Sequence, residues 1–219
     1  MKAPAASADR TRMRPSLSFC LCLPILATCA PAKPPTPASV APPPAAAPAV
    51  APAAVHPLVA AARAQVGVCV TYDPAYAKLA FPMGDVQKER GVCCDVVIRA
   101  LREAKKLDLQ AQVNADMRPH FDAYPKTWGL RRPDANIDHR RVPNLETWMR
   151  RQGWELPAAA ALVPGDIVTC RLNGTLPHIM LVADPARDAA GQLRVLHNIG
   201  GGTREEAVGF ALTGRFRTK

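Results

Sequence analysis

The chain has 219 residues, with 28 basic and 18 acidic side chains, a formal net charge of +10 and 23 prolines. Five of the basic residues and one of the acidic residues precede residue 58, so the remainder keeps a net charge of +6. This surplus suits an anionic partner such as a cell-wall polymer or a membrane surface. The basic patches interleaved with aromatic side chains that mark a nucleic-acid reader are not evident, so we expect no nucleic-acid partner.

The positions of the prolines divide the chain into a proline-rich N-terminal part and a domain that begins at residue 58. Ten prolines lie in residues 31–57, among many alanines and almost no charge. Such a segment cannot bury a core, and we predict a semi-rigid extended linker there. Residues 58–219, 162 in number, have the size of a single domain with a full hydrophobic core.

Residues 1–30 have the pattern of a secretory signal. Three arginines between residues 10 and 14 precede a short apolar run at 17–27, which is too short for a membrane span. The sequence LATC at 26–29 resembles a bacterial lipoprotein box, with Cys29 as the residue that would be lipidated. Ordinary cleavage after Ala30 or Ala32 is the alternative. We therefore predict export, to the periplasm or the outer membrane, with a membrane tether if Cys29 carries lipid.

The first half of the domain is predicted to be mainly helical. We expect a helix over 58–65, a short β-prone run at 68–72, a loop with one helical turn at 76–84, and a buried helix from Cys93 to near Leu107. Residues 114–141 are polar and rich in turn residues, and a long loop of this kind is often functional. A short amphipathic helix follows, capped at 143–144 and closed by Gly153.

The last third changes to the periodicity of strands. We predict strands at 167–172, 178–183 and 193–198, and a further β-like stretch at 207–217. Asn173-Gly174 is a strong hairpin turn signal between the first two strands. Helices followed by an antiparallel meander indicate an α+β fold, with the cysteine helix packed on the sheet.

Cys93 is the candidate nucleophile. A thiol at a helix N-terminus faces unpaired N–H groups and a partial positive charge, and both favour the reactive thiolate. The alternative is a core cysteine, because cysteine is among the most buried residue types. The helical pattern alone does not exclude the adjacent Cys94.

After export, Cys69, Cys93, Cys94 and Cys170 would meet an oxidising compartment. A Cys69–Cys170 disulfide is one candidate, whereas a bond between Cys93 and Cys94 would be strained. The spacing of the cysteines does not predict a structural zinc site.

Two histidines on neighbouring strands supply the partners that a thiolate nucleophile needs. Strand alternation places His178 and His197 on the same face, and pairing Asp184 with Gly191 would set them directly opposite each other. Cys93, His178 and His197 would then be nucleophile, base and orienting residue. Asn198 points to the opposite face in this reading. Taken singly, His178 is typical of a sheet rim and His197 of a satisfied core histidine.

A metal site would use the same two histidines with Asp166 or Asp184. The sequence carries no helical two-histidine signature for such a site, so we predict neither a metal nor a cofactor.

Five motifs resemble the bacterial family called domain of unknown function 1287: RGVCCDVVIR (90–99), WGLRRP (128–133), NIDHRRVPNL (136–145), PGDIV (164–168) and HNIG (197–200). That family in turn resembles the NlpC-type, papain-like cysteine peptidases of the bacterial cell wall. The likeness implies a papain-like domain, with Cys93 as nucleophile, His178 as base and His197 as third member. Asp95 departs from the glycine usual in the wall peptidases, and its carboxylate is expected to oppose thiolate formation.

Several further residues are candidates for substrate contacts. The backbone N–H of Cys93 and a donor from Tyr72 or Asp73 are expected to hold an oxyanion. His139, Arg140 and Arg141 are candidates for binding substrate carboxylates, with a solvated loop as the alternative.

The sequence thus predicts an exported cysteine peptidase or amidase that acts through an acyl-enzyme, with a peptidoglycan stem peptide or another peptide as substrate. One alternative is a non-catalytic wall-binding or envelope-assembly lipoprotein that keeps the fold. Another is a thiol acyltransferase.

Overall fold

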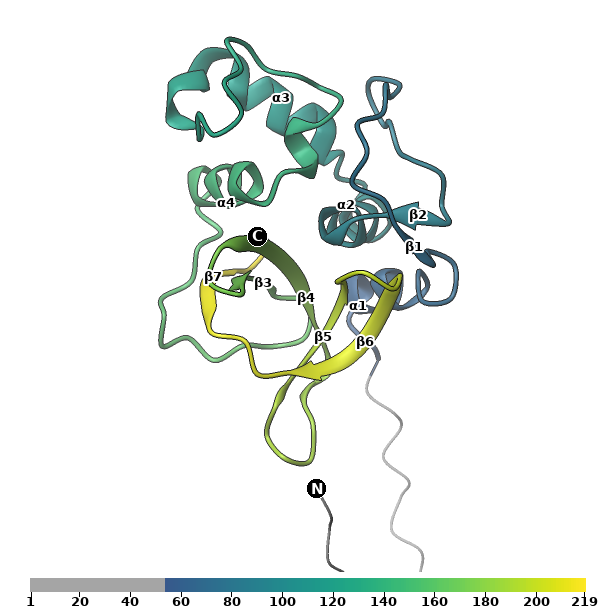
Figure 1. Ribbon diagram of the computed structural model, residues 1–219. Coiled ribbons are helices and arrows are strands. Elements are labelled where there is room, and N and C mark those ends of the chain that lie inside the picture. Colours follow the sequence, from purple (N-terminus) through teal and green to yellow (C-terminus); the bar gives the residue numbers. More distant parts are fainter. Residues whose placement is uncertain (1–53) are drawn as a thin grey trace, which may run out of the picture. The chain divides into compact units, whose positions relative to one another are not determined.

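Four helices pack against a five-stranded antiparallel sheet in the computed structural model, which describes residues 54–219 (Figure 1). The predicted α+β class is confirmed. The predicted signal, the lipidation of Cys29 and most of the linker lie outside the described residues. Within 54–219, none of the helices combines the length and apolar composition that crossing a membrane requires.

The helix predicted from the cysteine onward is confirmed. Helix α2 (Cys93–Lys105) begins at the cysteine, and the left-handed backbone of Lys106 closes it after Lys105. Helix α1 (Pro57–Arg63) and helix α4 (Val142–Arg151) also form where helices were predicted. The cap of α4 was misplaced, because Pro143 lies in the first turn, where a missing N–H costs nothing.

The stretch predicted as one long loop is wrong in its first part. Helix α3 (Leu109–His120) occupies it, followed by short 3₁₀ turns at Phe121–Ala123 and Asp138–Arg140. Asp108 caps α3 by accepting a hydrogen bond from the backbone N–H of Gln110. Leu109, Val113 and Met117 form its buried face at a spacing of four residues. This spacing could have predicted the helix, but the polar residues between these positions led to the prediction of a loop.

The loop before α2 has little regular structure. The helical turn predicted within 76–84 is wrong, because residues 81–83 form only an isolated turn and the rest of the stretch is irregular. Of the β-prone run, only β1 (Thr71–Tyr72) forms, and it pairs in parallel with β2 (Arg90–Gly91).

The sheet has the order β6-β5-β4-β3-β7. Its strands are β3 (Ile167–Leu172), β4 (Leu176–Arg187), β5 (Leu193–Asn198), β6 (Thr203–Val208) and β7 (Leu212–Phe216). The hairpin at Asn173-Gly174 is confirmed, with positive φ at both residues. The β-like stretch predicted at 207–217 contains the end of β6 and all of β7, and these are separate strands: β6 pairs with β5, whereas β7 crosses to the far side of β3.

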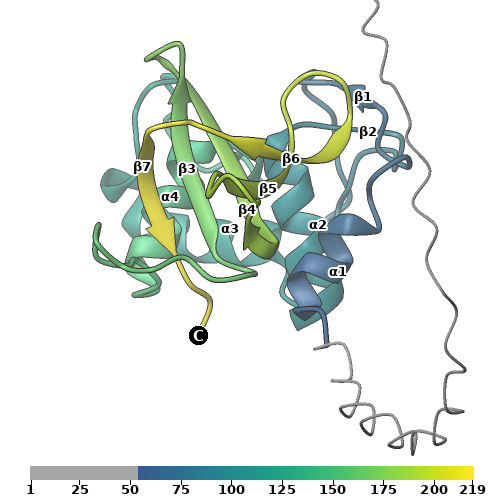
Figure 2. The ribbon, with the colours of Figure 1, turned by 90° about the horizontal axis from the view of Figure 1, so that it is seen from below.

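This topology forces the sheet to curl. Residues 209–211 alone join its two edge strands, and the four steps from Val208 to Leu212 reach at most about 14 Å. A flat sheet would place those edges about 19 Å apart. The curl is visible in Figure 1, and Figure 2 shows the helices gathered on one side of the strands. A second apolar cluster, including Val168, Met180 and Val195, fills the face of the sheet that alternates with the helix-packed face.

The predicted pairing of the two histidine strands is wrong by two residues. Leu181 pairs with Leu196 and Val182 with Val195, so His178 and His197 are diagonal neighbours. An irregularity after Val182 lets β4 continue to Arg187, which pairs with Leu193 and leaves a shorter loop than expected. Because the shift is an even number, both histidines keep the same face.

A buried ion pair joins α2 to the turn Asp138–Arg140. Arg140 donates from Nε and Nη2 to the two carboxylate oxygens of Asp95, at 3.0 and 2.9 Å, and both side chains are almost fully buried. Asp95 Oδ2 also accepts the backbone N–H of Val92 at 2.6 Å, at the start of α2. The carboxylate expected to oppose the thiolate is therefore paired with a guanidinium.

Replacing Asp95→Asn should leave the Arg140 charge buried and uncompensated, at a cost of about 3–5 kcal/mol in the free energy of unfolding. Urea denaturation of the purified chain measures this. Asp122→Asn is the matched control, because Asp122 forms only an exposed ion pair with Lys126. An Asp95→Asn loss no larger than that of Asp122→Asn would show that the pair does not hold α2 in place.

Candidate functional site

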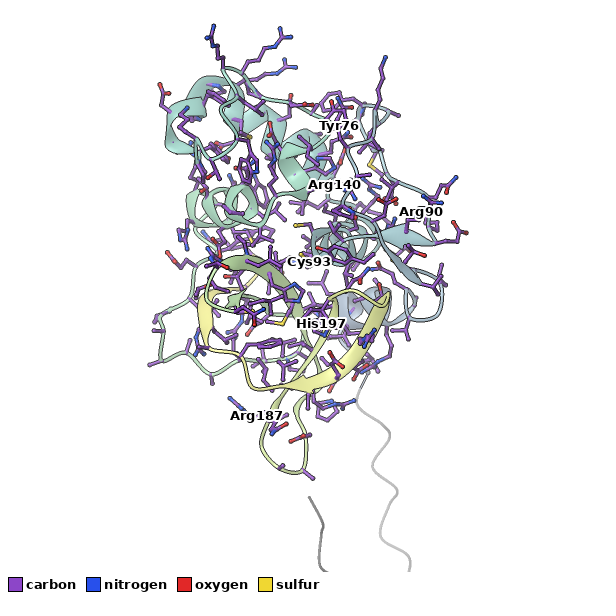
Figure 3. All side chains as sticks on the ribbon, in the orientation of Figure 1. Tyr76, Arg90, Cys93, Arg140, Arg187 and His197 are labelled. Carbon is purple, nitrogen blue, oxygen red and sulfur yellow. The ribbon has the colours of Figure 1, made fainter. Side chains whose placement is uncertain are left out.

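Cys93 lies at the first position of α2, on the wall of a pocket of about 490 Å³. The other walls come from β1, the loop that precedes α4 and the start of β4, and they include Tyr72, Trp128, Arg141 and Leu176. Cys93 is 4% exposed, so its sulfur is sheltered but still borders open space. In Figure 3 the labelled Arg140, Cys93 and His197 follow one another from the helices to the sheet.

The environment of Cys93 favours the thiolate. The pKa of its thiol is lowered to about 5, chiefly by a hydrogen bond from the Cys94 thiol. Burial acts in the opposite direction, and His178 lowers the pKa further through a hydrogen bond and its charge. The backbone N–H of Ile179 adds a smaller contribution of the same sign.

The neighbouring Cys94 behaves in the opposite way. Its side chain is fully buried, and burial raises the pKa of its thiol well above the ordinary value, with the Cys93 charge adding to the effect. Cys94 therefore stays protonated and donates to Cys93. Cys93 borders the pocket and Cys94 does not, which favours Cys93 over Cys94 as the candidate nucleophile.

A chain of hydrogen bonds runs from His178 to the sheet edge. His178 Nε2 lies 2.8 Å from His197 Nδ1, and His197 Nε2 lies 2.7 Å from Glu206 Oε1 on β6. A carboxylate can only accept, so Nε2–H of His197 donates to Glu206 and its Nδ1 accepts from Nε2–H of His178. Burial lowers the pKa of His197, which agrees with a neutral ring in the middle. His178 Nδ1 is then left for the Cys93 proton.

Glu206 was missed by sequence reasoning. Its strand was predicted to begin only at Ala207, so no side chain of 203–206 was placed on a face. Glu206 pairs with Val195, two residues from His197 on the same side of β5. Alternation along β6 would have found it had the strand been recognised.

Of the two residues expected beside the oxyanion, Tyr72 is well placed and Asp73 is not. Tyr72 lines the pocket with Cys93, and burial raises the pKa of its hydroxyl to about 12, with the Cys93 charge adding to this. The hydroxyl therefore remains a hydrogen-bond donor. The backbone N–H of Asp73 donates to the carbonyl of Gly91 at 3.1 Å and is not free for a substrate.

The three residues expected to bind carboxylates have different surroundings. His139 is buried away from the pocket, and burial lowers its pKa to about 4. Arg140 borders the pocket but is bound to Asp95, so the solvated-loop alternative is wrong for both residues. Arg141 borders the pocket, stacks on Trp128 at 4.1 Å and pairs with Asp138 at 3.1 Å.

The described region also bears on the disulfide candidate and on the metal alternative. The four cysteines of the described region are buried free thiols, so the Cys69–Cys170 disulfide is wrong. Within 54–219, His, Cys, Asp and Glu side chains do not gather into a group of three that could hold a metal ion. Asp166, a ligand in the metal alternative, is instead bound by Arg217 at 2.7 Å.

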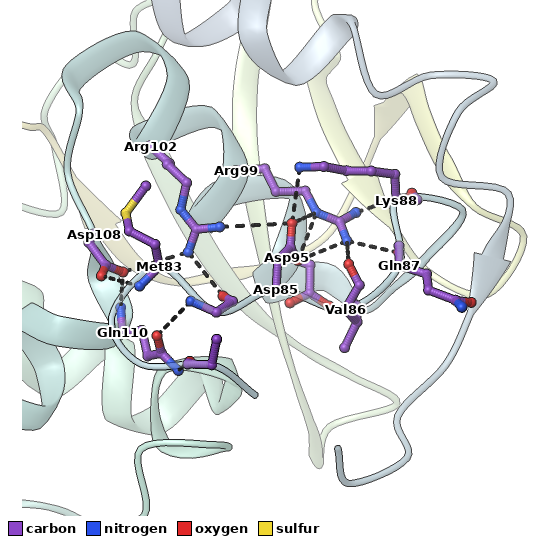
Figure 4. Close-up of polar contacts among 12 residues, drawn as sticks. Met83, Asp85, Val86, Gln87, Lys88, Asp95, Arg99, Arg102, Asp108 and Gln110 are labelled. Atoms are coloured by element: carbon purple, nitrogen blue, oxygen red, sulfur yellow. Dashed lines mark hydrogen bonds and ion pairs between the residues drawn. The ribbon is translucent and has the colours of Figure 1, made fainter. Parts of the chain in front are cut away.

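Two contacts hold the backbone just before Cys93. Asn198 donates to the carbonyl of Gly91 at 3.0 Å, which ties the end of β5 to β2 rather than to His178. Arg99 of α2 binds Asp85 at 3.0 Å and donates to the carbonyls of Val86, Gln87 and Arg90, whereas Arg102 lies near Asp85 and Asp108 (Figure 4). The loop that leads into Cys93 is thereby fastened to the helix that Cys93 begins.

The fold and site define an α+β domain that presents a helix-terminal cysteine to a pair of linked histidines. Residues 59–218 match the family described as domain of unknown function (DUF1287), and the chain belongs to this family. It is 52% identical over 162 residues to "Uncharacterized protein YijF" of Escherichia coli (strain K12), an alignment that covers 71% of this chain and 78% of that protein.

The lowered pKa of the Cys93 thiol can be tested by its reactivity. Alkylation of Cys93 by iodoacetamide should rise with pH through a midpoint near 5 rather than near the ordinary 8.5, and His178→Ala should move that midpoint upward. Peptide mass spectrometry of the reduced chain separates the cysteines. Cys170 is the internal control, because burial raises its pKa. Equal profiles for Cys93 and Cys170 would rule out an activated thiol.

The contribution of Glu206 to the hydrogen-bond chain can be tested in the same way. Glu206→Gln removes a negative charge that stabilises a proton shared by His178 and His197. The alkylation midpoint of Cys93 should therefore rise, but by less than in His178→Ala. Glu205→Gln is the matched control, because the neighbouring Glu205 pairs with Arg63 and Arg194 instead. If the two variants give the same midpoint, Glu206 has no part in the chain of hydrogen bonds.

Proposed function

We propose that this protein is a cysteine amidase or peptidase that works through an acyl-enzyme. The observation that carries the proposal is the chain Cys93–His178–His197–Glu206, in which a thiol of lowered pKa meets an oriented base. A helix-terminal cysteine facing an antiparallel sheet also supports the papain-like, NlpC-type fold expected from the sequence.

The reaction follows from the positions of these groups. The Cys93 thiolate attacks the carbonyl carbon of an amide, and the oxyanion accepts hydrogen bonds from the backbone N–H of Cys93 and the Tyr72 hydroxyl. Protonated His178 gives its proton to the leaving amine as the C–N bond breaks. His178 then takes a proton from water, whose oxygen attacks the thioester, and the products are a carboxylic acid and the free thiol.

His197 and Glu206 have a positioning role in this scheme. Their hydrogen bonds fix the plane of the His178 ring and leave its other nitrogen for Cys93. Glu206 compensates part of the positive charge that develops on His178 when it holds the proton. The arrangement is that of a nucleophile and base with two orienting groups.

The substrate class rests on the predicted export and on the resemblance to wall peptidases. We propose a peptide amide of the cell wall, such as a peptidoglycan stem peptide, and a location in the periplasm or at the outer membrane. The pocket walls agree with a peptide, because they combine apolar side chains with the aromatic rings of Tyr72, Tyr76 and Trp128.

The test is to incubate the purified chain with muropeptides and follow new amines and acyl-Cys93 by mass spectrometry. Wild type should release product, Cys93→Ala should release none, and His178→Ala should lose about 10²–10⁴-fold in turnover. Glu205→Gln is the control, because Glu205 pairs with Arg63 and Arg194 and does not border the pocket.

Two results would overturn the proposal. Acylation of Cys93 by thioester donors, without release of product from muropeptides, would identify an acyltransferase. Absence of product from both wild type and Cys93→Ala on every substrate, with muropeptide binding retained, would identify a non-catalytic wall-binding protein.

A further inference from the structure

A second pocket, of about 870 Å³, adjoins the pocket of Cys93. Tyr76 lines both, and its side chain is 60% exposed. Trp128 borders the first pocket, and the residues directly after it, 129–136, form much of the wall of the second. A substrate that extends from Cys93 past Tyr76 therefore enters the second pocket.

The second pocket is lined by more basic than acidic side chains. Its charged residues are Arg118, Arg131, Arg132 and Asp134. Among residues 54–219, neither Arg131 nor Arg132 forms an ion pair or a side-chain hydrogen bond, and both are exposed. Arg118 is held in place by its Nε, which donates to the buried Asn114 at 3.0 Å.

The one acidic residue of the pocket is engaged by neutral donors. Asp134 accepts from the Tyr76 hydroxyl at 3.1 Å and from the backbone and side-chain amides of Asn136 at 2.9 and 3.0 Å. These bonds fix the Tyr76 ring between the two pockets. They leave the guanidinium groups of Arg131 and Arg132 without a carboxylate partner from the described chain.

We propose that this second pocket binds a free carboxylate of the peptide substrate through Arg118, Arg131 and Arg132. Guanidinium groups bind carboxylates with paired, charge-assisted hydrogen bonds, and three of them around one pocket give a site of net positive charge. The inference rests on the proposed function for the identity of the ligand as a peptide. It replaces His139 and Arg140 as the carboxylate-binding residues.

The experiment measures binding separately from turnover. The full chain carrying Cys93→Ala is titrated calorimetrically with purified muropeptides and with the same muropeptides after their carboxylates have been converted to amides. The free acids should bind about 10-fold or more tightly than the amides, and Arg131→Gln/Arg132→Gln should remove that difference. In the active chain, the same double substitution should raise KM and leave kcat unchanged.

The matched control is Arg150→Gln/Arg187→Gln, which removes the same charge outside both pockets. Figure 3 shows Arg187 at the far end of the sheet from Tyr76. Circular dichroism melts of both double variants report whether they fold. A weakening of equal size in the control would reduce the effect to long-range charge and overturn the proposal.

The remaining outcomes separate this inference from the proposed function. If the chain binds the free acids more tightly than the amides but shows no turnover, the carboxylate-binding pocket is supported and the proposed enzymatic function is overturned. If the chain turns over substrate but binds the acids and the amides equally, the carboxylate-binding proposal is overturned. It is also overturned if neither form of the muropeptides binds. Displacement by inorganic phosphate combined with equal binding of acid and amide would assign a general anion site and overturn the carboxylate proposal.

Discussion

The site depends first on the buried ion pair between Asp95 and Arg140. Its guanidinium reaches the first turn of α2 and also lies near the carbonyls of Asp73 and Ala75, so one side chain holds three segments that surround the Cys93 pocket. A buried pair of this kind adds little net stability compared with apolar packing, but either member alone is strongly unfavourable. The positions of α2, the Tyr72 loop and the turn at 138–140 therefore all depend on this one ion pair.

That pairing also changes the electrostatics of the thiol. A carboxylate two residues from Cys93 would by itself raise the pKa of the thiol, but Arg140 offsets its charge. With Asp95 paired, the thiolate is favoured by the Cys94 thiol and by His178, which together outweigh the cost of burial. Cys93 and Cys94 are adjacent and similarly buried, yet their pKa values move in opposite directions. Successive helical residues point about 100° apart, so only one of the two thiols is directed at the histidine.

The local features of this site could be predicted from the sequence, whereas the contacts between residues far apart in the chain could not. The start of α2, the Asn173-Gly174 hairpin and the shared face of His178 and His197 follow from apolar periodicity, turn residues and strand alternation, which act over a few positions. The register of β4 and β5 depends on an irregularity between Val182 and Arg187, where Pro185 signals a disrupted ladder but does not fix how many residues it absorbs. The partners of Asp95 and His197 are Arg140, 45 residues away, and Glu206 on a strand that was not recognised. Residue types therefore indicated a candidate nucleophile and base, whereas the fold was needed to find the side chains that contact them.

The segment 128–141 shows how one stretch serves both stability and recognition. Arg140 points into the protein and is neutralised by Asp95, whereas Arg141 stacks on Trp128 at the pocket wall and Arg131 and Arg132 face the second pocket. These arginines look equivalent in a polar, aperiodic sequence, and burial alone separates them. A guanidinium that is almost fully buried needs a fixed carboxylate to be tolerated, so it is not available to a ligand. The exposed Arg131 and Arg132 do not need a fixed carboxylate. They, and not the buried Arg140, are therefore the arginines that we propose to bind an anionic group.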